Sequence, residues 1–214
     1  MIVDMGSGGR VQARCALLLA LVCVAAPPQV IEFESGGLHY KTLTKSGFTI
    51  MFATLPSHVR RWAVLQVSVS NGSSIPWVIK PADFSWQKPD GETIQASAAG
   101  DVVDSLLDKA SRGDVIKLVS AYEAAIYGNT RLRTSNGYEA RRRDALAEVS
   151  SAKLKAAAAA SAIALVNTKL APGESTDGAV FFPNAGKTLG PGKLFVHAAA
   201  ETFEFDNESA EASR

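Results

Sequence analysis

The period of the hydrophobic pattern changes twice along the chain, and this change limits the folds that the chain can adopt. Residues 30–98 form short runs in which apolar and polar side chains alternate, as in "WAVLQVSVSN", and turn segments such as "NGSS" and "KPDG" separate these runs. This pattern is typical of antiparallel strands. From Asp101 the apolar residues recur at helical spacing, and from Val166 the alternation returns. The sequence therefore predicts a set of strands that one helical segment interrupts.

The economical architecture is a mainly β chain, an antiparallel β-sandwich with an α-helical insertion. Strands recur at intervals of about ten residues, a spacing typical of sandwiches. Two separate domains are the alternative, but the C-terminal strands are too few to form a stable sheet alone. The predicted segments are the N-terminal strands 30–98, the insertion 99–164, the completing strands 165–206 and a flexible tail 207–214.

The insertion is predicted to be a helical hairpin or three helices. We expect Gly113 to break or kink the first helical run and Asp114 to cap the second, which Gly128 stops. A third helix should begin near Tyr138 and continue through the alanine-rich residues 156–162. Because alanine has the highest helix propensity, that stretch needs no special function.

The first residues predict a signal peptide, residues 1–26. Arg10 and Arg14 precede the apolar run "CALLLALVCVAA", which two prolines end and which is too short to span a bilayer comfortably. We therefore expect a periplasmic or secreted protein with no stable membrane span after cleavage. A buried N-terminal helix of a cytoplasmic protein is the alternative. A lipoprotein is less favoured, because Val22, which precedes Cys23, is not a small residue.

Composition and motifs argue against several chemistries. Both cysteines, Cys15 and Cys23, lie in the signal segment, so the mature chain would have no disulfide, thiol nucleophile or cysteine-bound metal. The histidines lack metal-ligand spacing, "NAGKTLGPGK" lacks the first glycine of a phosphate loop, and there is no Gly-x-Ser-x-Gly motif. A formal net charge of +1 gives no global field that would attract nucleic acid. We expect no cofactor, no metal and no nucleic-acid partner.

Two stretches of the sequence carry a family resemblance. The segments "VLQVSVSNGSSIPWVIKPADFSWQKPDGE" and "LAPGESTDGAVFFP" resemble the immunoglobulin-like domains of bacterial cell-envelope and secreted proteins of unknown function. The resemblance leaves out the helical insertion and implies an immunoglobulin-like β-sandwich. It implies no catalytic residue.

The segment "RLRTSNGYEARRRDAL" is the best candidate interaction site. On a helical wheel its Arg141, Arg142 and Arg143 fan out and do not form one stripe. Arg142 falls at the edge of the apolar face, so we expect it to form a structural ion pair with an acidic residue such as Glu123 or Asp114. The candidate binding residues, which would contact an envelope protein or an anionic envelope polymer, are Arg131, Arg133, Tyr138, Arg141 and Arg143.

The sequence leaves two functions open. The first is an exported, non-enzymatic immunoglobulin-like protein that has a binding or structural role in the bacterial cell envelope and interacts through its helical insertion. The alternative is a carbohydrate-binding protein or hydrolase with a carboxylate and aromatic cleft between sheet and helices. Trp62, Trp77 and Trp86 could line such a cleft, but aromatic residues are enriched in strands, and we expect these three to pack in the core.

Overall fold

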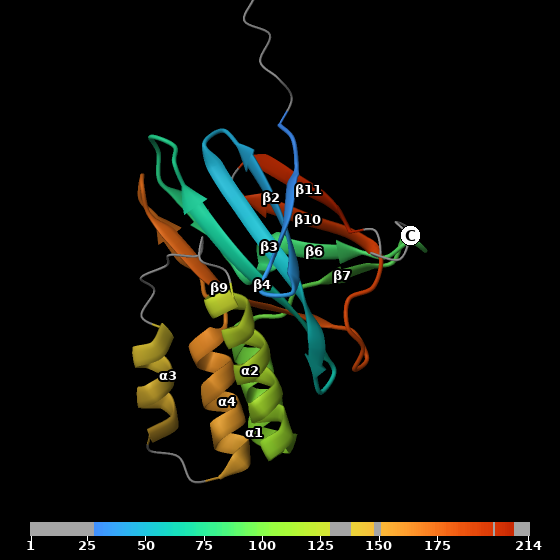
Figure 1. The fold of residues 1–214 in the computed structure, drawn as a ribbon, viewed down its shortest axis with the longest axis vertical. Helices are drawn as coiled ribbons and strands as arrows, with labels where there is room; N and C mark the ends of the chain where they lie inside the picture. Colours follow the sequence, from blue (N-terminus) through green and yellow to red (C-terminus); the bar gives the residue numbers. More distant parts are fainter. Residues whose placement is uncertain (1–27, 129–137, 148–150, 199, 208–214) are drawn as a thin grey trace, which may run out of the picture.

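The chain has 214 residues, of which the computed structural model describes 28–128, 138–147, 151–198 and 200–207 (Figure 1). Within these ranges strands predominate, the sheets are antiparallel, and four helices lie between the seventh and eighth strands. The mainly β prediction is confirmed. None of the described helices is long and apolar enough to cross a membrane. The predicted signal peptide, residues 1–26, lies outside the described residues.

The larger sheet has five strands in the order β1-β2-β3-β4-β9. A tight hairpin at "SGG" joins its first two strands, and Gly36 and Gly37 adopt positive φ values of 60° and 75° there. The register of β3 against β4 shifts between Thr54 and His58, so the hairpin continues beyond a bulge. The strands are β1 (Ile31–Ser35), β2 (Leu38–Lys45), β3 (Phe48–Val59), β4 (Trp62–Asn71) and β9 (Ser175–Pro183).

A four-stranded sheet in the order β11-β10-β6-β7 faces the larger one. The predicted "KPDG" turn joins β6 to β7, and a separate pair of short strands, β5 and β8, is also antiparallel. A single 3₁₀ turn, η1 (Pro81–Asp83), precedes β6. The remaining strands are β5 (Trp77–Ile79), β6 (Phe84–Gln87), β7 (Thr93–Gln95), β8 (Thr168–Leu170), β10 (Gly192–Ala198) and β11 (Glu201–Asn207).

Aromatic side chains fill the space between the two sheets. Phe48 stacks on Trp77 with ring centroids 4.3 Å apart, and Phe52 meets Phe205 edge to face at 5.0 Å. Trp86 is fully buried in the same core. The prediction that the tryptophans pack in the core is confirmed, since Trp62 and Trp77 are buried as well.

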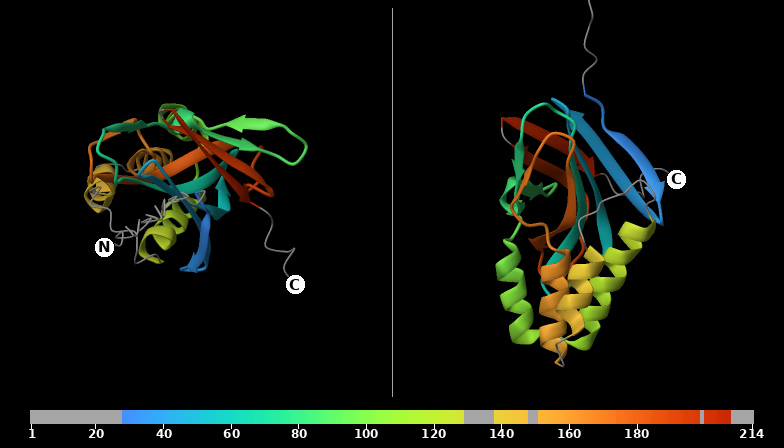
Figure 2. Two further views of the ribbon diagram at one scale, coloured as in Figure 1. Left: turned by 90° about the horizontal axis from the view of Figure 1, so that it is seen from above. Right: turned by 90° about the vertical axis from the view of Figure 1, so that its left-hand side faces the viewer.

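The helices form a third layer on the other face of the larger sheet. Figures 1 and 2 show them side by side at one end of the sandwich, against β3, β4 and β9. A second core lies between sheet and helices, where Tyr40, Trp62 and Phe181 of the sheet pack with Leu106 and Tyr122 of the helices. The middle of the larger sheet is therefore buried on both faces. The helices are α1 (Ala99–Lys109), α2 (Arg112–Gly128), α3 (Tyr138–Ala147) and α4 (Ala152–Ile163).

The helix boundaries differ from the predicted ones because serine caps define them. The single third helix predicted from Tyr138 is two helices, α3 and α4, and the Oγ of Ser151 caps α4 by accepting a hydrogen bond from the Leu154 amide at 3.2 Å. The first break precedes Gly113, since Asp114 Oδ2 accepts from the Ser111 amide at 2.7 Å and the Ser111 Oγ faces the Asp114 amide at 3.3 Å. This reciprocal pair is a capping box. Ser111 is thus the cap.

The alanine-rich helix α4 is the centre of the helical layer, because it packs against α1, α2 and α3. The small alanine side chains let the three neighbouring helices approach α4 closely, so that the helices can pack without large voids. The composition of α4 therefore has a packing role that helix propensity alone did not predict. Its buried residues are Ala156, Ala157, Ala159, Ala160, Ala162 and Ile163.

The segments that precede α1 and follow α4 cover part of the outer edge of β9. The Leu165 amide donates to the Ala179 carbonyl at 2.9 Å, and the Ser97 amide donates to the Phe181 carbonyl at 2.8 Å. A Cβ on Gly178 would lie 2.6 Å from the Leu165 nitrogen, so this close approach requires glycine. The first residues of β9 lie beyond these two bridges, next to a cavity.

Candidate functional site

A cavity of about 620 Å³ lies where α3 and α4 meet the β8–β9 hairpin. We call it the polar cavity, because charged and hydroxyl side chains from both layers line it. The helices place one cation and one hydroxyl there, and the hairpin supplies both acids and the second cation. Its main polar residues are Arg141, Ser161, Lys169, Glu174, Thr176 and Asp177.

Both acids of the polar cavity are held by hydrogen bonds. Asp177 on β9 is 6% exposed and accepts from the Tyr122 hydroxyl at 2.7 Å. Burial, followed by the negative charge of Asp177, raises the pKa of Tyr122 well above its usual value, so this hydroxyl stays a donor. Glu174 accepts from the Ala171 amide at 2.7 Å and closes the turn before β9. The two carboxylates are therefore fixed in position.

The two cations come from different layers of the fold. Arg141 projects from α3, and its Nη2 lies 3.4 Å from the carbonyl oxygen of Ala162 in the last turn of α4. The C-terminal end of a helix carries partial negative charge, which favours a guanidinium there. Lys169 is exposed on β8 and forms no ion pair with any described acid. Its ammonium group is available to a ligand.

Several hydroxyl groups at the cavity also remain available. Thr168 donates to the Val166 carbonyl at 2.9 Å, but the hydroxyls of Ser161, Ser175 and Thr176 make no hydrogen bond within the described part of the chain. Each hydroxyl can donate one hydrogen bond and accept others. The lining of the cavity therefore combines two cations, two carboxylates and several neutral hydrogen-bonding groups.

The described arginines of the predicted site do not form one surface, because each lies in different surroundings. Arg142 Nη1 lies 2.9 Å from Glu123 Oε1, one of the two partners considered from the sequence, and Arg143 is exposed. Arg141 alone of these three lines the polar cavity. The arginines fan out as the helical wheel predicted. Arg131 and Arg133 lie outside the described residues.

Tyr138 was a candidate binding residue, but it is only 5% exposed. Its ring lies against that of Tyr122 with centroids 5.1 Å apart, and its hydroxyl donates to Glu123 at 3.4 Å. Burial, with the nearby charge of Glu123, raises the pKa of Tyr138 above its usual value. Tyr138 therefore packs inside the helical layer and does not present its ring at the surface.

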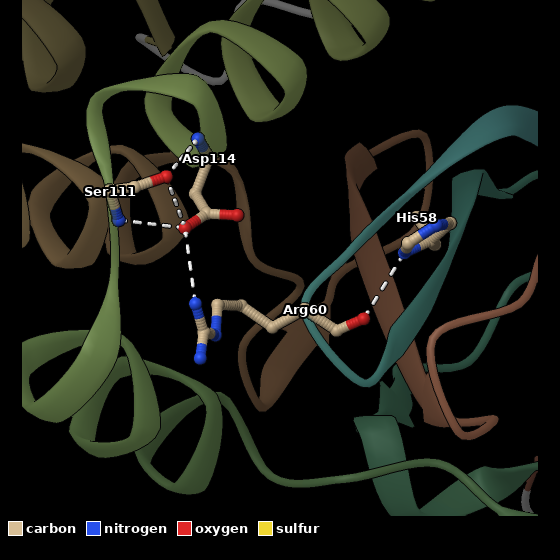
Figure 3. Close-up of polar contacts among 4 residues, drawn as sticks. All are labelled: His58, Arg60, Ser111 and Asp114. Carbon is tan, nitrogen blue, oxygen red and sulfur yellow. Dashed lines mark hydrogen bonds and ion pairs between the residues drawn. The ribbon is translucent and has the colours of Figure 1, made fainter.

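A second group of polar contacts joins the β3–β4 turn to the start of α2. Figure 3 shows Arg60 reaching toward Asp114, with Nη1 and Oδ2 3.8 Å apart, while the Arg60 carbonyl lies 3.1 Å from His58 Nδ1. Asp114 is thus occupied by Arg60 and by Ser111 at the capping box. It is not the partner of Arg142, and this group of contacts fixes the hairpin to the helices.

Sequence reasoning found one member of the polar cavity and missed the others. Lys169, Thr176 and Asp177 lie on strands, and their partner helix α3 is remote in sequence. The only local signal was the concentration of acids and hydroxyls in "LAPGESTDG". Among the described residues, no three histidine, aspartate or glutamate side chains gather in a way that could hold a metal ion. Neither a family model, nor a curated protein, nor a solved structure matches the chain.

Proposed function

We propose that this chain is an exported, non-enzymatic binding protein of the bacterial cell envelope that holds an acidic glycan in the polar cavity. The observation that carries the proposal is the meeting of Arg141, from the helical insertion, with Lys169 and free hydroxyls from the β8–β9 hairpin in one cavity. Two facing antiparallel sheets around an aromatic core support an immunoglobulin-like sandwich, as the sequence resemblance implies.

The mixed lining fits a ligand that carries one anion among several hydroxyls. A carboxylate or phosphate would accept hydrogen bonds from the Arg141 guanidinium, which presents paired donors. Glu174 and Asp177 add negative charge to the same cavity, so a densely anionic polymer would be repelled. Sugar hydroxyls can donate to these carboxylates. An envelope polysaccharide with one acidic group per short repeat therefore matches the cavity better than a polyanion.

The test is calorimetric titration of the folded chain with a tetrasaccharide of alternating glucuronic acid and N-acetylglucosamine. Maltotetraose, a tetrasaccharide of the same length that carries no charge, is the control ligand. We expect the acidic tetrasaccharide to bind and Arg141→Gln to weaken this binding by at least about tenfold, because a hydrogen bond to a charged group contributes about 1.5–3 kcal/mol. Lys169→Gln, on an exposed strand position, should also weaken binding.

Arg143→Gln is the matched control, since Arg143 is exposed on the same helix and does not line the cavity. It should leave binding unchanged, and circular dichroism would verify that every variant folds. Equal affinity for maltotetraose, or unchanged binding by both Arg141→Gln and Lys169→Gln, would overturn the proposal. An absence of binding to the acidic tetrasaccharide would count against it in the same way.

A further inference from the structure

The outer edge of β1 lies at one side of the larger sheet. In the order β1-β2-β3-β4-β9 this strand is terminal, and among the described strands it pairs with β2 alone (Figure 2). An unpaired strand edge presents N–H and C=O groups to which another extended chain can add. Strand addition at β1 requires free backbone groups, and the side chains of β1 decide which chain they accept.

The fold covers other sheet edges with side chains or with short bridges. The ammonium groups of Lys41 and Lys45 on β2 donate to the carbonyl oxygens of Asp206 and Thr202 on β11. The outer edge of β9 carries the two bridges from the segments beside the helices. Within the described part of the chain, β1 has no comparable cover. Its edge therefore differs from those of β9 and β11.

The turn between β1 and β2 determines which backbone groups point outward. Both glycines of this turn have positive φ, as in a type I′ turn, in which the two flanking residues bond to each other. Bonded and non-bonded pairs then alternate along the two antiparallel strands. By this alternation Phe33 is bonded to β2, whereas Glu32 and Glu34 are not. The amides and carbonyls of Glu32 and Glu34 therefore face outward.

The side chains of β1 give the two sides of this edge a different character. Phe33 packs against the core below the helices, and Ile31, on the same side of the sheet, is 60% exposed. Glu32 and Glu34 project to the other side and are exposed. Glu32 pairs with Lys41 at 2.7 Å, whereas Glu34 forms no ion pair with any described residue. A strand added here meets one apolar side and one acidic side.

Charge selects against a second copy of the chain at this edge. In an antiparallel pair, residues whose backbone groups bond to each other lie directly opposite one another. Two β1 strands would therefore place a carboxylate of Glu32 or Glu34 opposite a carboxylate of the other copy. Like charges in this position are destabilising, whereas opposite charges stabilise the pair. The edge thus favours lysine or arginine on the added strand.

We propose that the β1 edge binds an extended segment of a partner protein in which basic and apolar residues alternate. The segment adds antiparallel to β1, and its backbone bonds to the outward groups of Glu32 and Glu34. Its basic side chains lie beside the two carboxylates, and its apolar side chains pack beside Ile31 and Phe33. This contact is independent of the polar cavity, which lies at the β9 side of the same sheet.

Amide hydrogen exchange measures each backbone group of β1 separately. The probe is the peptide acetyl-Val-Lys-Val-Lys-Val-amide, added to the ¹⁵N-labelled folded chain. We expect saturating peptide to slow exchange of the Glu32 and Glu34 amides at least about tenfold, because both amides gain an acceptor. The Phe33 amide is already bonded within the sheet, so it is the internal control and should change little.

Related peptides separate strand addition from simple charge attraction. The peptide acetyl-Val-Val-Val-Lys-Lys-amide has the same composition and charge but lacks the alternation, and a peptide with glutamate in place of lysine reverses the charge. N-methylation of both lysines removes the backbone donors that face β1. Each of these three changes should abolish most of the protection. N-methylation of the central valine, whose amide points away from β1, should preserve it.

Substitutions at Glu34 test the charge and the backbone separately. Glu34→Gln should weaken the peptide about threefold, as expected for an exposed ion pair. Glu34→Pro should weaken it at least about tenfold, because it also removes the outward N–H. The β1–β2 ladder tolerates this change, since proline is accepted on an edge strand whose N–H faces solvent. Glu92→Gln, in the turn between β6 and β7, is the matched control and should not change the affinity. Arg141→Gln should keep the affinity as well, so failure of the glycan proposal leaves this one standing.

Unchanged exchange of the Glu32 and Glu34 amides at saturating peptide would overturn the proposal. Equal protection by the non-alternating peptide would overturn it as well, because charge alone would then hold the peptide. Slow exchange of the same two amides before any peptide is added would show that the edge is already occupied. A concentration-dependent dimer in that experiment would identify the occupant as a second copy of the chain.

Discussion

Asp83 and Asp177 are both buried carboxylates, yet their surroundings differ. Asp177 accepts a hydrogen bond from a tyrosine hydroxyl, whereas Asp83, 9% exposed, accepts from the Lys80 amide at 2.9 Å and has the Lys80 ammonium 3.9 Å away. Burial raises the pKa of Asp83, and the contacts with Lys80 offset only part of this effect. The carboxylate of Asp83 is therefore better solvated in the unfolded chain than in the folded one.

Asp83→Asn should therefore change the pH dependence of stability. A carboxyl group whose pKa is higher in the folded state binds more protons there, so its contribution to the free energy of unfolding falls as pH rises through that interval. We expect the stability of the variant relative to the wild type to increase from pH 3 to pH 6, because asparagine does not ionise. Urea unfolding of both proteins at the two pH values checks this.

The control for that comparison is Glu34→Gln, which changes an exposed carboxyl group. Its stability difference from the wild type should stay nearly constant over the same interval. A difference for Asp83→Asn that stays constant or decreases toward pH 6 would show that Lys80 compensates fully for burial.

Residue roles could be predicted where the partner lies on an adjacent helix. The wheel placed Arg142 at an apolar edge, and its ion pair with Glu123 joins α3 to α2. The same reasoning could not find the contact of Arg60 with Asp114. That contact depends on where the β3–β4 turn meets the helices, which no local pattern encodes.

At the scale of single elements, α4 shows how composition and packing are connected. Ala160 is fully buried among the neighbouring helices, while Lys153 is exposed on the same helix. Added methylene groups in a tightly packed core force side chains off their rotamers or move the backbone, at about 1–3 kcal/mol. The position of a residue on α4 therefore decides whether it can be enlarged.

Ala160→Leu should destabilise the protein by about 1–3 kcal/mol in urea unfolding, because the added side chain has no space between the helices. Lys153→Leu introduces the same side chain on the exposed face and should change stability by no more than about 0.5 kcal/mol. Equal effects of the two substitutions would mean that α4 is not tightly enclosed.

Strands and helices differed in how well the sequence predicted their ends. The "KPDG" turn was found because proline and glycine favour turns, and Gly91 has a positive φ of 89° there. The helix breaks were misplaced because Ser111 and Ser151, which cap α2 and α4, give no distinctive sequence signal: a serine acts as a cap only where its hydroxyl meets a free amide. In the sequence, Gly113 suggested a break two residues after Ser111, and the continuous helical periodicity after Tyr138 hid the break before Ser151.

At the scale of the whole molecule, the helical insertion is a structural layer of the protein. It covers one face of the larger sheet, so Tyr40, Trp62 and Phe181 depend on it for burial. The four described helices lie within the predicted segment 99–164, but their packing on the sheet was not predicted, because the alternation along β4 does not reveal that both of its faces are covered.

Replacement of residues 99–164 by a short Gly-Ser linker should therefore leave an aggregation-prone protein. The exposed sheet face would carry large apolar side chains in a contiguous patch. We expect the shortened chain to bind a hydrophobic dye such as ANS and to lose cooperative thermal unfolding, which fluorescence and calorimetry would measure. A soluble monomer with cooperative unfolding would show that the sandwich folds without its helices. Point substitutions at the polar cavity are accordingly better probes of binding than this deletion.

The pairing of β4 with β9 also has a consequence for how the chain folds. Trp62 and Pro183 are paired although all four helices lie between them in the sequence. The entropy of loop closure rises only slowly with length, by about 0.6 kcal/mol for each doubling, so the insertion adds little to the equilibrium cost. Non-local pairing nevertheless slows folding. Helices that pack on β3 and β4 before β9 arrives would shorten the effective loop, because α4 ends directly beside the Ala179 carbonyl. We therefore expect early helix packing to accelerate the return of the last strands.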